Sequence, residues 1–506
     1  MRRRAKLFPP PKNDFRIDYK QCKLHVKTTE KTGKITFIKY RLTKKEVFIV
    51  KYAINKFWAG SSRREVFGLD ADSMKKILCD AVDSAACTVQ SYADDIAVHP
   101  ELGFAETRTA EMLAKELEAL GLSVQKGLAL TGVRADLACG KKGPRIAVLG
   151  ELDAVPCAAH PMADPVTAAS HSCGHNLQTS IVLAAASALA KTEVCKELAG
   201  SVAFIGTPAE EFIEITKRNE MRKEGKIKYL CGKPEMIRLG VFDDIDMSVM
   251  IHAGENIKGP GFAIPKGGNG FRTFMLKYVG RQAHAAAAPE QGINALYAAV
   301  AGINAVNALR ETFRDEDRVR VHFIITKGGD TVNCVPDDVR LEGYVRATTA
   351  EKIDEIFDKV IRAFRSGADA LGAECLVNSF PGDMPFVPSQ AFNRVFEENA
   401  VSVAGRGNVQ ADTIFAASSD MGDVMHIMPA IHPFGGGVEG AYHSKDFKVL
   451  DFEAAVLMPA KAILMSIVDL LADDASKARE ILADFKPVYT KEEYLAAMDR
   501  RFFSEI

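Results

Sequence analysis

One stretch, from Gly150 to Asn176, constrains the fold more than any other part of the chain. It follows the apolar run Ile146–Leu149, which predicts a buried strand of a parallel sheet. This strand brings Glu151 and Asp153 to its carboxyl end, the edge at which open α/β sheets bind ligands. The sequence therefore predicts an α/β fold with a polar site at the ends of its strands.

Cys173 and His175 lie two residues apart, on either side of Gly174, shortly before an alanine-rich helix predicted for Ser180–Lys191. A thiolate and an imidazole on one tight turn can reach a single cation. A borderline-soft ion such as Zn²⁺ accepts this pair of ligands. The pair is therefore a candidate metal half-site.

Two adjacent carboxylates, Glu210 and Glu211, follow a second predicted strand, Ser201–Gly206. If both are poorly solvated, their mutual repulsion raises the pKa of one of them. A metal ion relieves this repulsion by binding one carboxylate, and the other is then free to carry a proton. The alternative is a surface loop with two solvated glutamates, and the pair by itself does not exclude it.

Two histidines complete the candidate site. His252 follows a third predicted strand, Met247–Ile251, and His443 follows a glycine-rich loop. A histidine after a strand can be structural as well as metal-binding, but His252 lies at the same predicted edge as the carboxylates. Together the candidates indicate a metal site in an α/β domain, with Glu210 as the free carboxylate beside Cys173, His175, Glu211, His252 and His443.

The segment 268–384 has a different organisation. Its pattern predicts strands at 271–279, 319–325, 339–345 and 375–377 and helices at 293–313 and 353–371, which is the ferredoxin-like split order. The first helix has one apolar stripe, formed by Ile293, Leu296, Val300, Ile303, Val306 and Leu309. We expect this segment to be a domain inserted between residues 73–267 and 385–475 of the first domain, with a helical tail at 476–506.

The charge of the chain is unevenly distributed. Residues 1–66 carry 19 Lys and Arg against 5 Asp and Glu, so the remainder has a formal charge of −15. The basic segment could bind nucleic acid or an anionic membrane, or act as a targeting peptide, but we expect residues 1–70 to be an extension outside the fold. The acidic main body argues against a nucleic-acid enzyme, so no nucleic-acid partner is expected.

Length and cysteine usage narrow the class further. A chain of 506 residues predicts two or three domains. No run of about 18 apolar residues predicts a transmembrane span, so no membrane partner is expected. The 10 cysteines show no paired spacing and the start lacks a secretory signal, so we expect a cytoplasmic protein with reduced thiols.

Seven motifs resemble those of one family and occur in its order along about residues 75–470. On these motifs the chain resembles the metal-dependent aminoacylase/carboxypeptidase superfamily (metallopeptidase family twenty), above all the amidohydrolase branch of auxin-conjugate, hippurate and aminobenzoyl-glutamate hydrolases. The motifs are His-Pro-Glu-Leu-Gly-Phe (99–104), Gly-Glu-Leu-Asp-Ala-Val-Pro (150–156), His-Ser-Cys-Gly-His-Asn (171–176), Pro-Ala-Glu-Glu (208–211), Gly-Arg-Gln-Ala-His-Ala (280–285), Gly-Gly-Asp-Thr-Val-Asn-Cys-Val-Pro-Asp (328–337) and Ser-Ser-Asp-Met-Gly-Asp (418–423).

The resemblance implies a catalytic α/β sandwich with an inserted ferredoxin-like α+β domain that serves for dimerisation and as a lid. It also implies two divalent metal ions, Zn or Mn. Cys173 resembles the bridging ligand and Glu210 the general base that activates water. The residues that resemble the terminal ligands are His175, Glu211, His252 and His443.

Further residues take their expected roles from the same resemblance. Asp153 matches a carboxylate that orients a ligand histidine. His284 matches the residue that reaches across a dimer to polarise the scissile carbonyl, and Asn333 and Arg346 match positions that hold the substrate's carboxylate or carbonyl. Asn176 stands where the family usually has Asp, so we expect it to orient His175 less strongly.

Three functions follow as hypotheses. The first is a metal-dependent amidohydrolase that cleaves N-acyl amino acids or small amino-acid conjugates with a metal-activated water, as a homodimer formed through the inserted domain. The second is a dipeptidase of the same superfamily. The third is a non-catalytic binding protein that keeps the fold, which the Asn176 substitution motivates.

Overall fold

The computed structural model describes residues 14–19, 22–28, 35–37 and 69–506, and the chain divides into two compact units, residues 1–68 and 69–506. In the first unit β1 (Asp14–Tyr19), β2 (Cys22–Thr28) and β3 (Ile35–Phe37) form an antiparallel sheet. Most of the predicted extension, residues 1–70, lies outside the described residues.

The second unit contains a six-stranded sheet in the order β18-β10-β6-β9-β5-β4. Its centre is parallel, as the sequence predicts, because β6 pairs in parallel with both β9 and β10. β5 joins β9, and β4 joins β5, by antiparallel pairing. The strands are β4 (Val124–Leu128), β5 (Gly132–Ala138), β6 (Lys141–Glu151), β9 (Ala199–Thr207), β10 (Met247–Val249) and β18 (Ala430–Ile431).

Alternate residues of β6 enter two different cores, so the sheet is covered on both faces. Ile146 and Val148 pack in a core with α2 (Ala71–Ala97), α4 (His175–Lys191) and α11 (Met458–Leu471). Ala147 and Leu149 pack in a second core with α6 (Gly232–Arg238), α10 (Met421–Ile427) and α13 (Lys491–Arg500). This is the predicted α/β sandwich.

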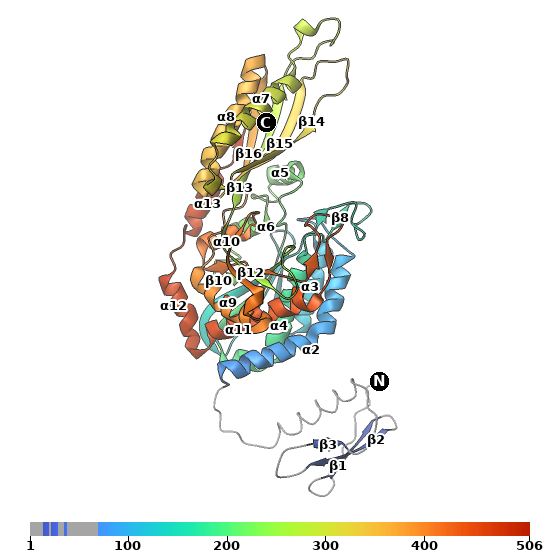
Figure 1. Ribbon diagram of the computed structural model, residues 1–506, viewed down its shortest axis with the longest axis vertical. Helices are drawn as coiled ribbons and strands as arrows, with labels where there is room; N and C mark the ends of the chain where they lie inside the picture. The colour runs from blue at the N-terminus through green and yellow to red at the C-terminus, as the bar shows by residue number, and fades with distance from the viewer. Residues whose placement is uncertain (1–13, 20–21, 29–34, 38–68) are drawn as a thin grey trace. The chain divides into compact units, whose positions relative to one another are not determined.

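Segment 270–381 forms the predicted ferredoxin-like arrangement. Its sheet has the antiparallel order β14-β15-β13-β16, and α7 and α8 lie side by side on one face of it (Figure 1). The elements are β13 (Gly270–Val279), α7 (Ala295–Leu309), β14 (Arg320–Lys327), β15 (Asp338–Ala347), α8 (Ala350–Leu371) and β16 (Glu374–Pro381).

A smaller sheet in the order β11-β19-β12-β17 lies between the strands of the first domain and the inserted segment in the chain. Its strands are β11 (His252–Ala253), β12 (Phe262–Gly268), β17 (Val409–Phe415) and β19 (Phe434–Gly435). The remaining elements are α3 (Thr107–Ala119), β7 (Val155–Pro156), β8 (Ala169–Ser170), α5 (Ile215–Lys223), α9 (Gln390–Ala404), β20 (Val438–Glu439), β21 (Lys448–Val449) and α12 (Ser476–Asp484).

The start of α4 differs from the prediction. The helix begins at His175, five residues before Ser180. Gly174 has a φ of +88°, a left-handed conformation that costs glycine little, and it turns the chain directly into the helix. His175 therefore stands in the first turn of a helix rather than in a loop.

The stripe predicted for α7 is wrong. Of its six residues only Val306 is fully buried, and Val300 is 42% exposed. The buried face consists instead of small residues, because α7 and α8 approach closely at Gly302 and Gly367: a Cβ added to Gly367 would lie 2.2 Å from the Gly302 nitrogen. Larger side chains are thereby kept out of the interface between these helices.

The segment 476–506 is not purely helical. After α13, β22 (Phe503–Ser504) pairs with β16 and adds a fifth strand to the inserted sheet. No sequence pattern predicts this strand, because two residues are too few for a periodic signal. The segment thus contacts both the first domain and the inserted one.

In the part of the chain that the structure describes, one helical stretch, Glu453–Leu471, is long and apolar enough to cross a membrane by length and composition. It comprises a π-helical turn and α11, and 78% of its most apolar window is buried inside the protein. That burial is what a core helix of a folded domain shows.

Candidate metal and catalytic site

The strand ends deliver the acidic side chains, as the sequence predicts. Glu151 is the last residue of β6, and Glu210 and Glu211 follow β9 after a short turn. In that turn Ala209 has a φ of +47°, and its backbone N–H donates to the buried carboxylate of Glu106 at 2.7 Å. The turn that aims both glutamates is therefore held in place by a buried hydrogen bond.

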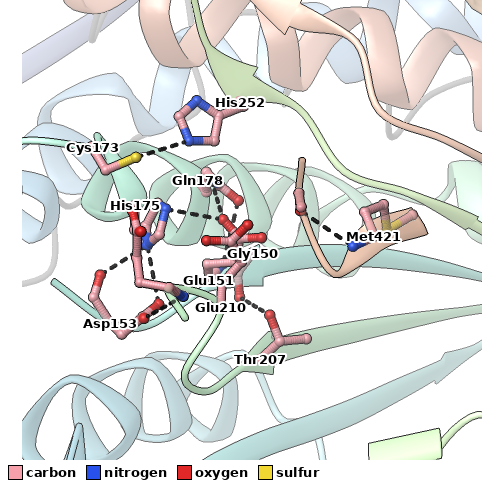
Figure 2. Close-up of polar contacts among 12 residues, drawn as sticks. Gly150, Glu151, Asp153, Cys173, His175, Gln178, Thr207, Glu210, His252 and Met421 are labelled. Carbon is pink, nitrogen blue, oxygen red and sulfur yellow. Dashed lines mark hydrogen bonds and ion pairs between the residues drawn. The ribbon is translucent and has the colours of Figure 1, made fainter. Parts of the chain in front are cut away.

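Asp153 connects two parts of the site (Figure 2). Nδ1 of His175 lies 3.1 Å from Oδ1 of Asp153 and 2.9 Å from its backbone oxygen. Oδ2 of the same carboxylate accepts a hydrogen bond from the backbone N–H of Glu211 at 3.1 Å. The carboxylate thus fixes the ring of His175, whose Nε2 is directed away from it, and the start of Glu211.

A first group of potential ligands consists of Cys173, His175 and His252, whose donor atoms all lie within 4.8 Å of one another. All three residues are buried. Nδ1 of His252 faces the oxygen of Ala253 at 2.7 Å, and Nε2 lies 3.5 Å from Sγ of Cys173. With its proton on Nδ1, His252 presents the lone pair of Nε2 to the group.

A second group shares the same thiol. It contains Cys173, Glu211 and His443, again with donor atoms within 4.8 Å. Oε1 of Glu211 lies 2.8 Å from Nε2 of His443. One sulfur therefore stands between a histidine-rich group and a mixed carboxylate–histidine group.

The donor set fits divalent metal ions. Nε2 of His175 is buried without a hydrogen-bond partner, although it lies 3.1 Å from Oε2 of Glu151. Burial, together with Glu211 and Glu210, raises the pKa of the Cys173 thiol well above its usual value, so a buried thiolate here requires a cation. Sulfur, imidazole and carboxylate donors in this number are those that zinc-type ions bind.

Glu210 and Glu211 differ in their acidity in the metal-free protein. Burial raises the pKa of Glu210 well above its usual value, and the nearby charges of Glu151 and Glu211 raise it further. For Glu211, burial acts in the same direction, but the hydrogen bond to His443 outweighs it and lowers the pKa. This is the division between a proton carrier and a ligand that the sequence motivates.

A fully buried ion-pair network supports the site from below. Nζ of Lys233 lies 2.6 Å from Oε1 of Glu151 and also contacts Asp420. Oε2 of Glu151 accepts a hydrogen bond from Gln178 at 2.6 Å. None of the three charged side chains of this network, Glu151, Lys233 and Asp420, is exposed to solvent.

The network places Glu151 in contact with the site without making it a ligand of either thiol-containing group. The donor atoms of Glu151, His175 and Glu210 also lie within 4.8 Å of one another. Its charge is neutralised by Lys233, since burial would raise the pKa of Glu151 but the lysine and His175 lower it below its usual range. Sequence analysis noted Glu151 and Asp420 but missed Lys233, because a lysine in an amphipathic segment carries no signal of burial.

Three predicted residues are not brought to these groups within one chain. The amide of Asn176 donates to the oxygen of Ala93 at 3.3 Å, so its side chain points to α2 rather than to the ring of His175. His284 is exposed and lies beside Asn333, whose backbone oxygen accepts from Ala285 at 2.9 Å. His284 and Asn333 therefore form a separate exposed cluster on the inserted domain.

Arg346 lies on the inserted sheet at a cavity that Glu210 and Glu211 also line. Its guanidinium stacks over the rings of Tyr344 and Phe271 and donates to the hydroxyl of Ser418 at 2.9 Å. Of the predicted residues on the inserted domain, Arg346 is thus the one that faces the site in the single chain.

Comparison with known proteins gives a consistent result. The family model described as a peptidase dimerisation domain matches residues 267–370. A Xaa-Arg dipeptidase of Mus musculus is 28% identical over 79% of this chain and 90% of its own. A p-aminobenzoyl-glutamate hydrolase of Escherichia coli is 30% identical over 58% of each chain.

Solved structures share the fold. A dinuclear metal-binding peptidase of the M20 family from Bacillus subtilis has a TM-score of 0.58 at 20% identity, over 77% of this chain and 99% of its own. An aminobenzoyl-glutamate utilization protein from Klebsiella pneumoniae has a TM-score of 0.58 at 20% identity, over 78% of this chain and 98% of its own.

The buried network gives a prediction for stability. Lys233→Met leaves the carboxylates of Glu151 and Asp420 buried without a cation, so the free energy of unfolding should fall by about 3–5 kcal/mol. Urea unfolding followed by circular dichroism measures the change. The matched control is Lys228→Met, whose half-exposed pair with Asp499 is worth at most about 1 kcal/mol. Equal losses in the two variants would contradict the assigned importance of the network.

Proposed function

The chain belongs to the M20 family of metallopeptidases and amidohydrolases, and from this premise we propose that it is a metal-dependent amidohydrolase. Its substrates are N-acyl amino acids or small amino-acid conjugates, whose amide bond it hydrolyses. The relatives named for aminobenzoyl-glutamate and for indole-acetic-acid conjugates of amino acids support this substrate class.

One observation carries the proposal: a single thiol belongs to two groups of metal ligands, with a protonatable carboxyl beside them. Cys173 joins the group with His175 and His252 to the group with Glu211 and His443. This arrangement suits two ions held side by side by a shared sulfur. A binding protein with one structural ion would not need the second group or Glu210.

The bound ions would polarise the amide oxygen of the substrate and lower the pKa of a water molecule between them. Glu210 takes a proton from this water and passes it to the nitrogen of the leaving amine. Asp153 holds His175 and Glu211 in position during the reaction, because its carboxylate contacts both. Arg346 offers a cation for the carboxylate of the substrate from the inserted domain.

The metals are Zn or Mn. Thiolate and imidazole donors favour zinc, whereas carboxylate donors also suit manganese. Metal analysis of the purified protein decides between the two, and a protein that binds neither would refute the proposal.

A homodimer completes the site. The inserted domain exposes apolar side chains, with Tyr297 64% and Val332 fully accessible to solvent. Nδ1 of His284 accepts from the backbone N–H groups of Ala286 and Ala287 at 3.2 and 3.0 Å, so the ring proton is on Nε2. An exposed Nε2–H donor on the dimerisation domain can polarise the scissile carbonyl in the partner's site.

Dipeptide hydrolysis is the second candidate. It is favoured by the similarity to Xaa-Arg dipeptidases of Mus musculus and Homo sapiens, which this chain matches over 90% and 96% of their lengths. Free-amine dipeptides hydrolysed faster than the corresponding N-acetyl amino acids would establish it. For either activity we propose a cytoplasmic location, which imaging of the tagged protein tests.

The assigned base gives the first prediction of activity. Glu210→Gln removes the proton carrier but leaves both ligand groups intact, so kcat should fall by about 10²–10⁴-fold while the metal content stays the same. Amine release from a panel of N-acyl amino acids, aminobenzoyl-glutamate and dipeptides measures the loss. Equal turnover by the variant and the wild type would refute the base.

The partner's contribution gives a second prediction. His284→Ala should lower kcat by about 10²–10³-fold with both metals retained, because an oxyanion donor is lost. Mixing His284→Ala and Glu210→Gln chains should restore about a quarter of wild-type activity, since one site of each mixed dimer has both groups. No recovery in a mixture that exchanges subunits would contradict the shared site.

A further inference from the structure

A cavity of about 310 Å³ lies between the candidate catalytic groups and the inserted sheet. Glu210 and Glu211 line one end of it. Strands β13, β14 and β15 form its opposite wall, and Phe212 and Ile215 line it from the segment between β9 and α6. The side chains on this wall are therefore placed to contact whatever the catalytic groups bind.

Strand β15 presents alternate residues to this cavity. Glu342, Tyr344 and Arg346 line it, whereas Leu341 and Val345 belong to the hydrophobic core beneath α7 and α8. This alternation follows from the period of two residues in a strand. The wall thus carries, along one line, a carboxylate, an aromatic ring and a guanidinium.

The carboxylate of Glu342 has no cationic partner among the residues that the structure describes. Its neighbours in the adjacent strands are Met275 on β13 and Ile324 on β14, and neither is charged. The side chain accepts one hydrogen bond, from the hydroxyl of Thr216 at 3.0 Å. Within residues 69–506 no lysine or arginine forms an ion pair with it, although the side chain is half-buried.

The other charged groups on the cavity wall already have partners. The guanidinium of Arg346 lies against two rings and donates to Ser418. The hydroxyl of Ser418 in turn donates to the carboxylate of Asp383 at 2.8 Å. Glu211 is held by His443 and belongs to a ligand group. Glu342 is therefore the carboxylate left to meet a ligand.

We propose that Glu342 is a specificity-determining residue that binds the cationic side chain of the substrate, so that the preferred substrates are amides of lysine- or arginine-type amino acids. The inference rests on the proposed amidohydrolase function. A half-buried carboxylate with one neutral donor gains most from an ammonium or guanidinium group, which forms a charge-assisted hydrogen bond.

The dimensions of the wall suit such a substrate. Glu342 and Arg346 are four residues apart on one strand, which places their Cα atoms about 13 Å apart. Their side chains extend into this gap, so an amino acid with its carboxylate at Arg346 and a long cationic side chain can reach Glu342. The apolar stem of a lysine or arginine packs on apolar surface while its charged end stays polar, and Tyr344 and Ile215 offer that surface.

The experiment compares pairs of substrates that differ in charge but have nearly the same size. The wild-type protein, loaded with metal, is assayed with N-acetyl-lysine against N-acetyl-norleucine, and with N-acetyl-arginine against N-acetyl-citrulline. We expect kcat/KM to be at least about tenfold higher for each cationic member. In Glu342→Gln each ratio should fall by about tenfold, mainly through a higher KM for the cationic substrate.

Charge reversal and a matched control sharpen the test. Glu342→Lys should reduce the ratios below one and favour N-acetyl-glutamate over N-acetyl-lysine. Glu374→Gln, an exposed carboxylate on β16 outside the cavity, should leave every ratio as in the wild type. Because ratios are compared, a general loss of folded protein does not alter the result.

The failures of the two proposals are distinguishable. Turnover of the neutral substrates without preference for the cationic ones, or unchanged ratios in Glu342→Gln, would overturn the role of Glu342 and leave the amidohydrolase function standing. Absence of turnover with all four substrates, aminobenzoyl-glutamate and dipeptides would overturn both.

Discussion

Acidic side chains gather at the carboxyl ends of the parallel strands, and the site depends on the cations that compensate them. Glu151, Asp153, Glu210 and Glu211 all follow β6 or β9 within a few residues. Buried carboxylates without a counter-charge are costly. Lys233 supplies one positive charge, to Glu151 and Asp420. In our proposal the bound metal ions supply the rest, so that metal binding and the integrity of the site are linked.

The inserted domain supplies side chains of two kinds. Arg346 and Glu342 face the cavity of their own chain, because alternate residues of β15 point to it. His284 and Asn333 lie together at an exposed place on the same domain, away from those ligand groups. In the proposed dimer the first pair selects the substrate and the second pair acts in the partner's site. One domain would thus serve for specificity, for assembly and for catalysis.

The sequence predicts most of what periodicity and strand ends determine. The parallel strands and the ferredoxin-like order agree with the structure because each rests on several residues of regular pattern. The site residues on strand ends and on the Cys173–His175 turn come together for the same reason. The failures have local causes: Gly174 moves the start of α4, and close packing at Gly302 and Gly367 turns the large side chains of α7 away from the core. Lys233 could not be found, because its burial depends on tertiary contacts.

The central claim is that Cys173 is shared by two metal ions, and metal stoichiometry tests it most directly. Zinc or manganese bound per chain would be measured by mass spectrometry after dialysis, for the wild type and for Cys173→Ala. We predict two ions per chain in the wild type, and a weakened affinity for both in the variant, because each ligand group loses its sulfur. One ion per chain in the wild type, or two ions held as tightly without the thiol, would contradict the account.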